Sequence, residues 1–211
     1  MACKYSTWTR GKDEALLNIL GGQKIAELII AGKVKVAIEE IIESLLDFVA
    51  TVVVLATKSK FVASDNFKLK KDGGICSYLG DNFKAWFLNG DSKTEDPIGE
   101  QTLRYAKLRN VSVDGPIITE LGGEAKAETT LSEMFSLMEK QKNGESGVLL
   151  SNGYANIFYI RDIAGVLRAV GVSWYDDGWN VNADSVESPH EWDVGSQVFS
   201  RNPSATVSAT S

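Results

Sequence analysis

Histidine and cysteine, which carry much of the nucleophilic and metal chemistry of proteins, are almost absent from this chain of 211 residues. It contains one histidine, His190, and two cysteines, Cys3 and Cys76, which lie far apart in the sequence. This spacing is neither a metal-ligand pattern nor a disulfide framework, and it is typical of a protein from a reducing cytoplasm. We therefore expect no metal site and a cytoplasmic location.

Nucleotide-binding and nucleophile motifs are also missing. The two glycine pairs, Gly21-Gly22 and Gly122-Gly123, lack the flanking residues of a dinucleotide fingerprint or a phosphate-binding loop. No serine or cysteine lies in the glycine-flanked setting that exposes a nucleophile at a tight turn. The sequence therefore predicts no cofactor.

Basic residues are too few for a surface that binds the phosphate backbone. The chain has 22 Lys and Arg against 28 Asp and Glu, a net charge of −6, whereas backbone binding needs clustered cations. We therefore do not expect nucleic acid as a partner. A membrane partner is not expected either, because the most apolar stretch, residues 38–56, contains Glu39, Glu40, Glu43 and Asp47, which are costly in lipid. Residues 1–15 contain no apolar signal core.

What is present is the composition of a globular protein, with 44% hydrophobic and 24% charged residues. Residues 1–37 form the pattern of a helix-turn-helix-shaped module, with a first helix that ends at Gly21-Gly22 and a second that ends at Gly32. Two short helices cannot bury all their apolar side chains against each other. We therefore expect this module to dock onto its own second domain or a protein partner, through Leu17, Leu20, Leu28 and Ile29.

Residues 38–202 are predicted to form an α+β domain, followed by a low-complexity tail at 203–211. Apolar residues at helical spacing predict an amphipathic helix from Ile38 to Leu46, and a β-branched run predicts a strand from Thr51 to Leu55. Thr130-Leu131-Ser132-Glu133 is a capping box, which predicts a helix over residues 131–142.

The last third of the chain predicts a mainly antiparallel sheet that ends in a β-meander. Strand-forming runs cover residues 157–160, 166–174, 179–186 and 197–199. In the first run we expect Ile157 and Tyr159 to point to one face and Phe158 and Ile160 to the other, with Phe158 buried. Asp177-Gly178 is predicted to be a two-residue hairpin turn with Gly178 at positive φ.

Four segments from different parts of the chain stand out together, and they are Leu20-Gly21-Gly22, Tyr78-Leu79-Gly80-Asp81-Asn82-Phe83, Leu103-Arg104-Tyr105-Ala106-Lys107-Leu108 and Gln197-Val198-Phe199-Ser200-Arg201-Asn202. With them the chain resembles an uncharacterised family of hypothetical proteins from small-genome candidate-phylum (Patescibacteria-type) bacteria. The N-terminal module, the middle and the C-terminal strands each contribute matching segments, while residues 38–56 match least well. The resemblance implies a bacterial lineage and no assigned activity, ligand or catalytic residue.

The meander holds the candidate site residues. His190, Asp162 and Asp184 are candidates for acid–base catalysis, although Asp162 is also a natural turn residue and His190 can be a solvated loop residue. A second candidate is an aromatic ligand-binding platform made of Trp174, Tyr175, Trp179 and Trp192. Trp174 and Tyr175 point to opposite faces of one strand, and Trp174 and Trp179 can instead pair across the hairpin.

These observations lead to one expected function and two alternatives. We expect a non-catalytic binding or interaction domain of unknown ligand. The first alternative is a small hydrolase-like enzyme that uses carboxylates of the meander. The second is a DNA-associated regulator, which would need a basic stripe on the N-terminal helices, where the second helix offers Lys24 alone.

Overall fold

A computed structural model of the chain describes residues 22–31, 33, 44–175, 177–188 and 190–201. The chain divides into two compact units, residues 1–43 and 44–211. The predicted first helix, the predicted boundary between residues 37 and 38 and the predicted tail at 203–211 lie outside the described residues. In the first unit the expected second helix is present as α2 (Gln23–Ile30), which follows Gly22 at φ 92.

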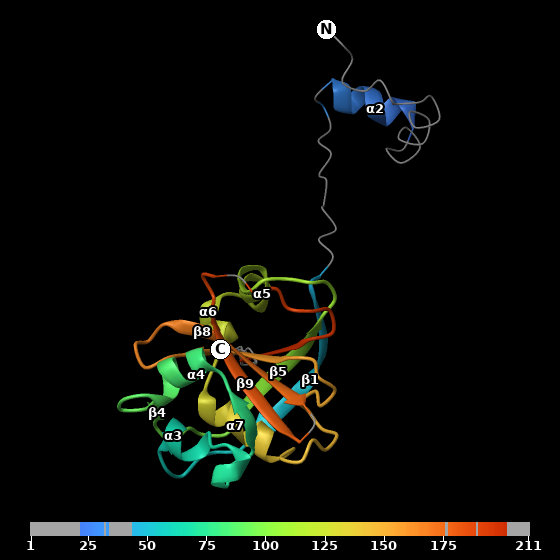
Figure 1. Cartoon of the computed structure of the whole chain (residues 1–211). Coiled ribbons are helices and arrows are strands. Elements are labelled where there is room, and N and C mark those ends of the chain that lie inside the picture. The colour runs from blue at the N-terminus through green and yellow to red at the C-terminus, as the bar shows by residue number, and fades with distance from the viewer. Residues whose placement is uncertain (1–21, 32, 34–43, 176, 189, 202–211) are drawn as a thin grey trace, which may run out of the picture. The chain divides into compact units, whose positions relative to one another are not determined.

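The second unit is built on an eight-stranded sheet that is mainly antiparallel (Figure 1), as the sequence predicts. The strands lie in the order β1-β5-β10-β7-β8-β9-β3, and β6 pairs with β7 off this path. A separate ribbon pairs β2 with β4. The bounds are β1 (Leu46–Val54), β2 (Phe61–Val62), β3 (Cys76–Leu79), β4 (Thr94–Glu95), β5 (Gln101–Leu108), β6 (Glu128–Thr129), β7 (Asn156–Arg161), β8 (Leu167–Tyr175), β9 (Gly178–Ser185) and β10 (Gln197–Arg201).

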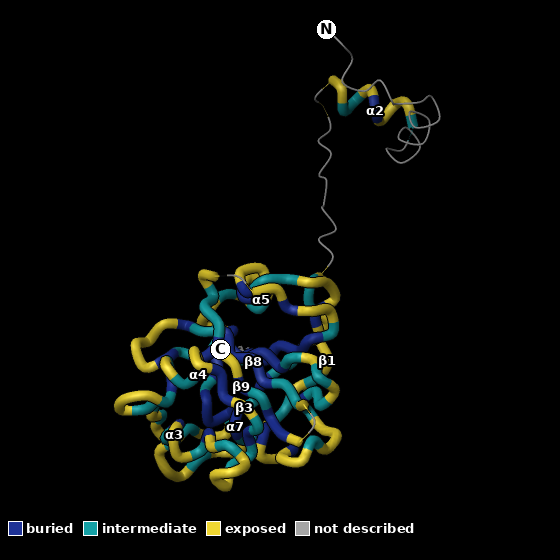
Figure 2. The backbone as a smooth tube through the Cα atoms, viewed as in Figure 1, coloured by how far each residue is buried: buried dark blue, intermediate teal, exposed yellow. Residues whose placement is uncertain are grey.

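Helices cover both faces of this sheet. One face packs against α7 and the α4–η2 segment, and the other packs against α5 and α6. Because helices pack on both faces, the strands β8 and β9 are mostly buried, whereas the surrounding loops are exposed (Figure 2). The helical elements are α3 (Ala63–Asn66), η1 (Lys70–Asp72), α4 (Asp81–Phe83), the π-helical η2 (Lys84–Leu88), α5 (Asp114–Leu121), α6 (Glu124–Ala127) and α7 (Leu131–Glu139).

β7 lies between β10 and β8 and is buried on both sides. Phe158 and Ile160 belong to the core under α7, whereas Ile157 and Tyr159 belong to the core under α5. The predicted alternation is therefore confirmed, and Phe158 is fully buried. The reason is that a strand with period two presents apolar side chains to both helical layers at once.

The predicted capping box is also confirmed, and it fixes the start of α7. The Thr130 hydroxyl accepts from the Glu133 backbone N–H at 3.2 Å, and the Glu133 carboxylate accepts from the Thr130 N–H at 2.8 Å. The Glu95 carboxylate accepts from the next two amides of the helix, those of Leu131 and Ser132, at 2.9 Å each. The free amides at this helix end are thus paired with side chains.

The C-terminal strands correct one feature of the predicted meander. β7, β8 and β9 are consecutive antiparallel neighbours, but β10 does not continue beyond β9. It crosses back to lie between β5, antiparallel, and β7, parallel. Local periodicity predicts a strand but contains no information on which strand pairs with it.

Two local predictions are wrong. Leu46 and Asp47 belong to strand β1 and not to the end of a helix, because they pair with Leu108 and Lys107 of β5. The β8–β9 turn also lies one residue earlier than predicted, since Gly178 pairs with Tyr175 as the first residue of β9. Gly178 is not in the left-handed region of φ.

Candidate functional site

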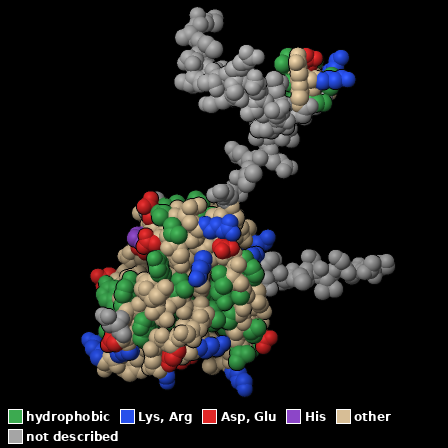
Figure 3. All heavy atoms as spheres, turned by 90° about the vertical axis from the view of Figure 1, so that its right-hand side faces the viewer, with side chains coloured by type: hydrophobic (Ala, Val, Ile, Leu, Met, Phe, Trp, Pro, Cys, Tyr) green, Lys and Arg blue, Asp and Glu red, His purple; other side chains and the backbone are tan. Residues whose placement is uncertain are grey.

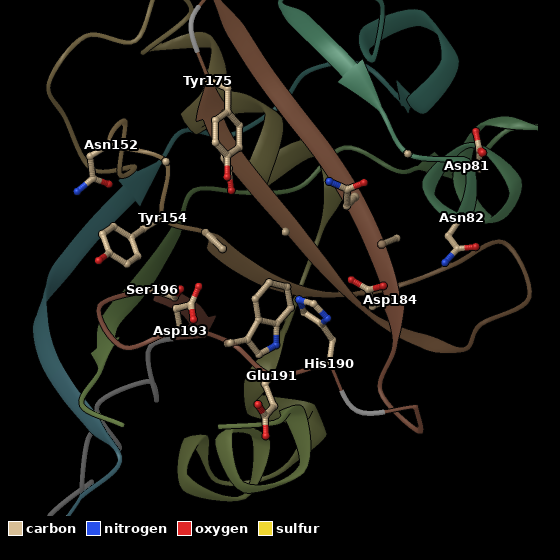
Figure 4. A pocket seen from close by; sticks show the side chains of 18 residues that line it. Asp81, Asn82, Asn152, Tyr154, Tyr175, Asp184, His190, Glu191, Asp193 and Ser196 are labelled. Atoms are coloured by element: carbon tan, nitrogen blue, oxygen red, sulfur yellow. The ribbon is translucent and has the colours of Figure 1, made fainter. Parts of the chain in front are cut away.

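A pocket of about 760 Å³ opens over β8 and β9, on the face of the sheet that α5 and α6 cover only in part (Figure 4). Its floor consists of residues 171, 173 and 175 of β8 and 182–184 of β9. Its walls come from three segments that are distant in sequence, residues 80–82, 152–155 and 190–196. Figure 4 shows Tyr154 and Tyr175 at one end of the pocket, Asp81 and Asn82 at the other, and Asp184 and His190 between them.

A glycine in β8 allows Trp192 to lie against the floor. A Cβ atom on Gly171 would lie 3.0 Å from Cη2 of Trp192, which is closer than ordinary van der Waals contact. The ring is therefore seated on bare backbone, and its exposed fraction is only 7%. Its position is fixed at the other end, because the Trp192 indole N–H donates to Oδ1 of Asp114 at 2.8 Å.

Asp114 is a fully buried carboxyl group behind this wall. Its Oδ1 also accepts from the Tyr159 hydroxyl at 2.9 Å, while Oδ2 has no hydrogen-bond partner among the described residues. Burial raises the pKa of Asp114, because removal from water destabilises the charged carboxylate. The hydrogen bonds from Trp192 and Tyr159 stabilise the charged form and lower the pKa, but by less. The group thus orients Trp192 from inside the core.

Two tyrosines form the aromatic end of the pocket, and each ring lies near a glycine. Tyr175 lies over Gly153, whose added Cβ would be 3.7 Å from the ring, and Tyr154 lies over Gly195 at 3.9 Å. Both glycines have positive φ, 89 and 88, which side chains disfavour. The rings remain about half exposed, at 50% for Tyr175 and 44% for Tyr154.

The charged groups that line the pocket are negative. They are Asp81, Asp184, Glu191 and Asp193, and no lysine or arginine is among the described residues that line the pocket. Asp81 forms an ion pair with Lys84 at 3.1 Å. The other three carboxylates form no ion pair with the residues that the structure describes. Carboxylates are therefore the predominant charged groups among the described residues that line the pocket.

The pairing of β3 with β9 positions the residues at the far end of the pocket. The Gly80 N–H donates to the Val181 carbonyl at 2.8 Å, where β3 runs parallel to β9. A Cβ on Gly80 would lie 2.4 Å from Oδ1 of Asn182. Glycine therefore lets the start of α4 lie beside the exposed Asn182 side chain, which would have to move for any larger residue.

The structure divides the predicted aromatic platform between two faces of the sheet. Tyr175 and Trp192 line the pocket. Trp174 and Trp179 pair across the hairpin on the opposite face, with ring centroids 5.2 Å apart at 81°. Trp179 is fully buried there, and its indole N–H donates to the Gln141 carbonyl at 3.2 Å.

The three predicted catalytic candidates are likewise separated. His190 and Asp184 both line the pocket, and the His190 ring meets Trp192 edge to face at 5.3 Å. Asp162 is elsewhere and has a structural role. It is buried, accepts from Arg168 Nε at 2.8 Å and from the Val166 N–H at 2.9 Å, and so closes the β7–β8 turn.

The predicted docking residues fall in the first unit. Leu17 and Leu20 lie outside the described residues. Leu28 and Ile29 are half-buried on α2, and the next residue, Ile30, is 86% exposed. Within α2 the only basic residue is Lys24, so this helix offers no basic stripe.

Neither a cluster of metal ligands nor a membrane-spanning helix is found in the described part of the chain. Residues 22–31, 33, 44–175, 177–188 and 190–201 contain no group of three or more His, Cys, Asp or Glu side chains that could hold a metal ion. In the same residues no helix is long and apolar enough to cross a membrane.

Several lining residues were not anticipated from the sequence, among them Asn82, Asn152, Tyr154 and Asn182. A signal for part of the site was present in β9, where Asn180, Asn182 and Asp184 alternate with Trp179, Val181 and Ala183. This alternation predicts a strand with one polar, open face. The loop residues carry no such signal, because their approach depends on pairing between distant strands.

Comparison of the chain with protein-family models, with curated proteins and with solved structures gives no match. The resemblance to the candidate-phylum family therefore stays a prediction.

Proposed function

We propose that the second unit is a non-catalytic ligand-binding domain whose β8–β9 pocket takes a small polar molecule without negative charge. The observation that carries this proposal is the lining, whose described residues include four carboxylates and no lysine or arginine. An anionic ligand such as a phosphate ester would have to enter a negative site with no cation to pair with it. A neutral or positively charged ligand avoids this cost.

The size and polarity of the pocket support the same function. A volume of about 760 Å³ lies in the range of ligand sites. The half-exposed rings of Tyr154 and Tyr175 offer apolar faces, and the side chains of Asn152 and Asn182 offer both donors and acceptors. Such a combination recognises molecules that carry polar groups on a carbon frame.

The test is an NMR titration of the full chain with matched fragments of neutral, positive and negative charge. We expect neutral or positive fragments to shift the amide signals of residues 152–155, 182–184 and 190–193, and anionic fragments to leave them in place. Tyr175→Ala should weaken binding. Tyr78→Ala is the matched control, because Tyr78 is 48% exposed on β3 and does not line the pocket. Fragments that bind only elsewhere would refute the proposal.

One observation favours a second candidate, a hydrolase. His190 and Asp184 share the pocket, and both side chains point into it (Figure 4). A histidine and a carboxylate in one pocket suit proton transfer once a substrate lies between them. If a bound ligand is converted, and His190→Gln and Asp184→Asn abolish conversion but retain binding, this candidate replaces the first.

For the first unit we propose that residues 1–37 dock onto a protein partner through the apolar side of α2, including Leu28 and Ile29. The support is the exposure of apolar side chains on this short helix, 86% at Ile30 and 37% at Ile25. The test is a pull-down with Leu28→Asp, and Lys24→Asp serves as the control on the same helix. Equal recovery of the partner by both variants would contradict the proposal.

A further inference from the structure

The pocket is lined by carboxylates without an ion-pair partner among the described residues, and by half-exposed aromatic rings. Asp184, Glu191 and Asp193 line it and form no ion pair with described residues. Asp184 comes from the rigid strand β9, whereas the other two flank Trp192 in the loop before β10. Because Trp192 is seated on Gly171 and bonded to Asp114, this loop is held against the sheet. The negative charges therefore have a defined place.

Aromatic side chains line the same pocket as these carboxylates. Tyr175 and Tyr154 stand at the end of the pocket opposite Asp81 and Asn82 (Figure 4), and their rings are about half exposed. Aromatic faces attract organic cations through the ring quadrupole, and they pack on the carbon atoms next to the charge. Neither tyrosine hydroxyl forms a hydrogen bond to another described residue that would close the end of the pocket.

From this arrangement we infer that the pocket is selective for an organic cation, a molecule with an ammonium or guanidinium group next to apolar carbons. The charged group pairs with Asp184 or Asp193, which face the pocket in Figure 4, and the carbon part contacts Tyr154 and Tyr175. The inference rests on the proposed function and narrows its ligand to one class. It adds that charge and not only shape determines affinity.

Two other ligand classes fit the lining less well. An inorganic cation needs several ligating side chains around one point, and among the described residues no group of three is so placed. A neutral polyhydroxylated ligand would use the asparagines and tyrosines but would leave the three carboxylates without a counter-charge. An organic cation satisfies both the charge and the aromatic surfaces.

The inference is tested with two pairs of probes of equal shape. Choline is compared with 3,3-dimethylbutan-1-ol, its neutral carbon analogue, and arginine amide is compared with citrulline amide. Affinity for the full chain is measured by NMR titration in low and high salt. Because the carboxylates attract the charged group of each cation and not its neutral replacement, we expect each cation to bind about tenfold or more tightly than its neutral partner. High salt should reduce this difference.

Isosteric variants separate charge from shape. Asp184→Asn keeps the size of the side chain, replaces one acceptor oxygen by an NH2 donor and removes the charge. It should weaken binding of the cations about tenfold and change binding of the neutral probes much less. Asp72→Asn is the matched control, because Asp72 is exposed on η1, does not line the pocket and should have no effect.

The outcomes distinguish this inference from the proposed function. Equal binding of cationic and neutral probes at the pocket, or cation binding unchanged by Asp184→Asn, overturns the selectivity for cations but leaves a ligand-binding pocket. Absence of any pocket shift with both cations also overturns the inference, and the wider neutral panel then decides the proposed function separately. Cation binding that Asp184→Asn weakens and Asp72→Asn does not is the supporting result.

Discussion

Phe158 is the side chain whose removal should damage the second unit most. It is fully buried in β7, lies opposite Val170 of β8, and stacks on Phe199 of β10 with centroids 4.4 Å apart and planes at 8°. Phe158→Ala removes the ring from the junction where β10 crosses back beside β7. Deleting a buried phenylalanine in this way costs roughly 3–5 kcal/mol, because the surrounding core collapses only partly into the cavity.

The measurement is urea unfolding of the wild type and three variants, followed by tryptophan fluorescence. Phe158→Leu keeps most of the volume and should cost less than about 1.5 kcal/mol. Tyr78→Ala, at a half-exposed site, should cost less than about 1 kcal/mol. The unfolding slope should stay the same for all four proteins. A midpoint for Phe158→Ala equal to that of the wild type would refute the assignment of β7 to the centre of the core.

Three further predictions concern Asp114, Gly178 and Cys76. Burial raises the pKa of Asp114, so its protonated form stabilises the fold fully below about pH 4, and this contribution is lost as the pH rises through the raised value. The free energy of unfolding of the wild type, measured by urea titration relative to Asp114→Asn, should therefore fall with rising pH, and a constant difference from pH 4 to 8 would contradict this. Gly178→Val should lower the free energy of unfolding by about 1–3 kcal/mol in the same assay, because a Cβ would lie 2.9 Å from the Ser77 backbone nitrogen. An unchanged free energy of unfolding would show that β3 moves away from residue 178 at no cost. In a Cys3→Ser background Cys76 should resist alkylation until the protein unfolds, because burial raises the pKa of its thiol to about 12, and rapid labelling of the native protein would disprove its burial.

Local sequence patterns predicted much of the secondary structure for clear physical reasons. The capping box at Thr130 and the glycine that ends α5, Gly122 at φ 95, act within one turn of the chain. The alternation in β7 follows from the period of a strand. Each feature depends on neighbours in sequence, which a single chain displays directly.

The features that were missed depend on partners far away in the chain. β10 lies between β5 and β7 because its residues pair with strands about 90 and 40 residues earlier, which no local period encodes. Gly178 is required by the approach of Ser77 from β3 and not by a turn. The pocket shows the same dependence, because Asn82, Tyr154 and His190 meet only after the sheet has formed.

The edge strand β1 carries exposed hydrophobic side chains. Figure 3, which faces the side of the molecule toward which β1 lies in Figure 1, shows hydrophobic side chains gathered between charged ones. Phe48, Val49 and Val53 of this edge strand are 45–52% exposed. The guanidinium group of Arg104 lies over the Phe48 ring at 4.9 Å and covers part of it. A charged neighbour of this kind reduces the tendency of an edge strand to pair with another chain.

A substitution that fills the β8–β9 pocket from its floor tests most directly whether this pocket binds a small polar ligand. Ser173 lines it from β8 and is half-buried, so Ser173→Trp places an indole ring in the ligand space without opening the core. For every fragment that shifts the pocket signals of the wild type, binding to Ser173→Trp is measured by the same titration, together with the urea midpoint. The account predicts lost binding with an unchanged midpoint. Fragments that bind the folded variant as tightly as the wild type would contradict it.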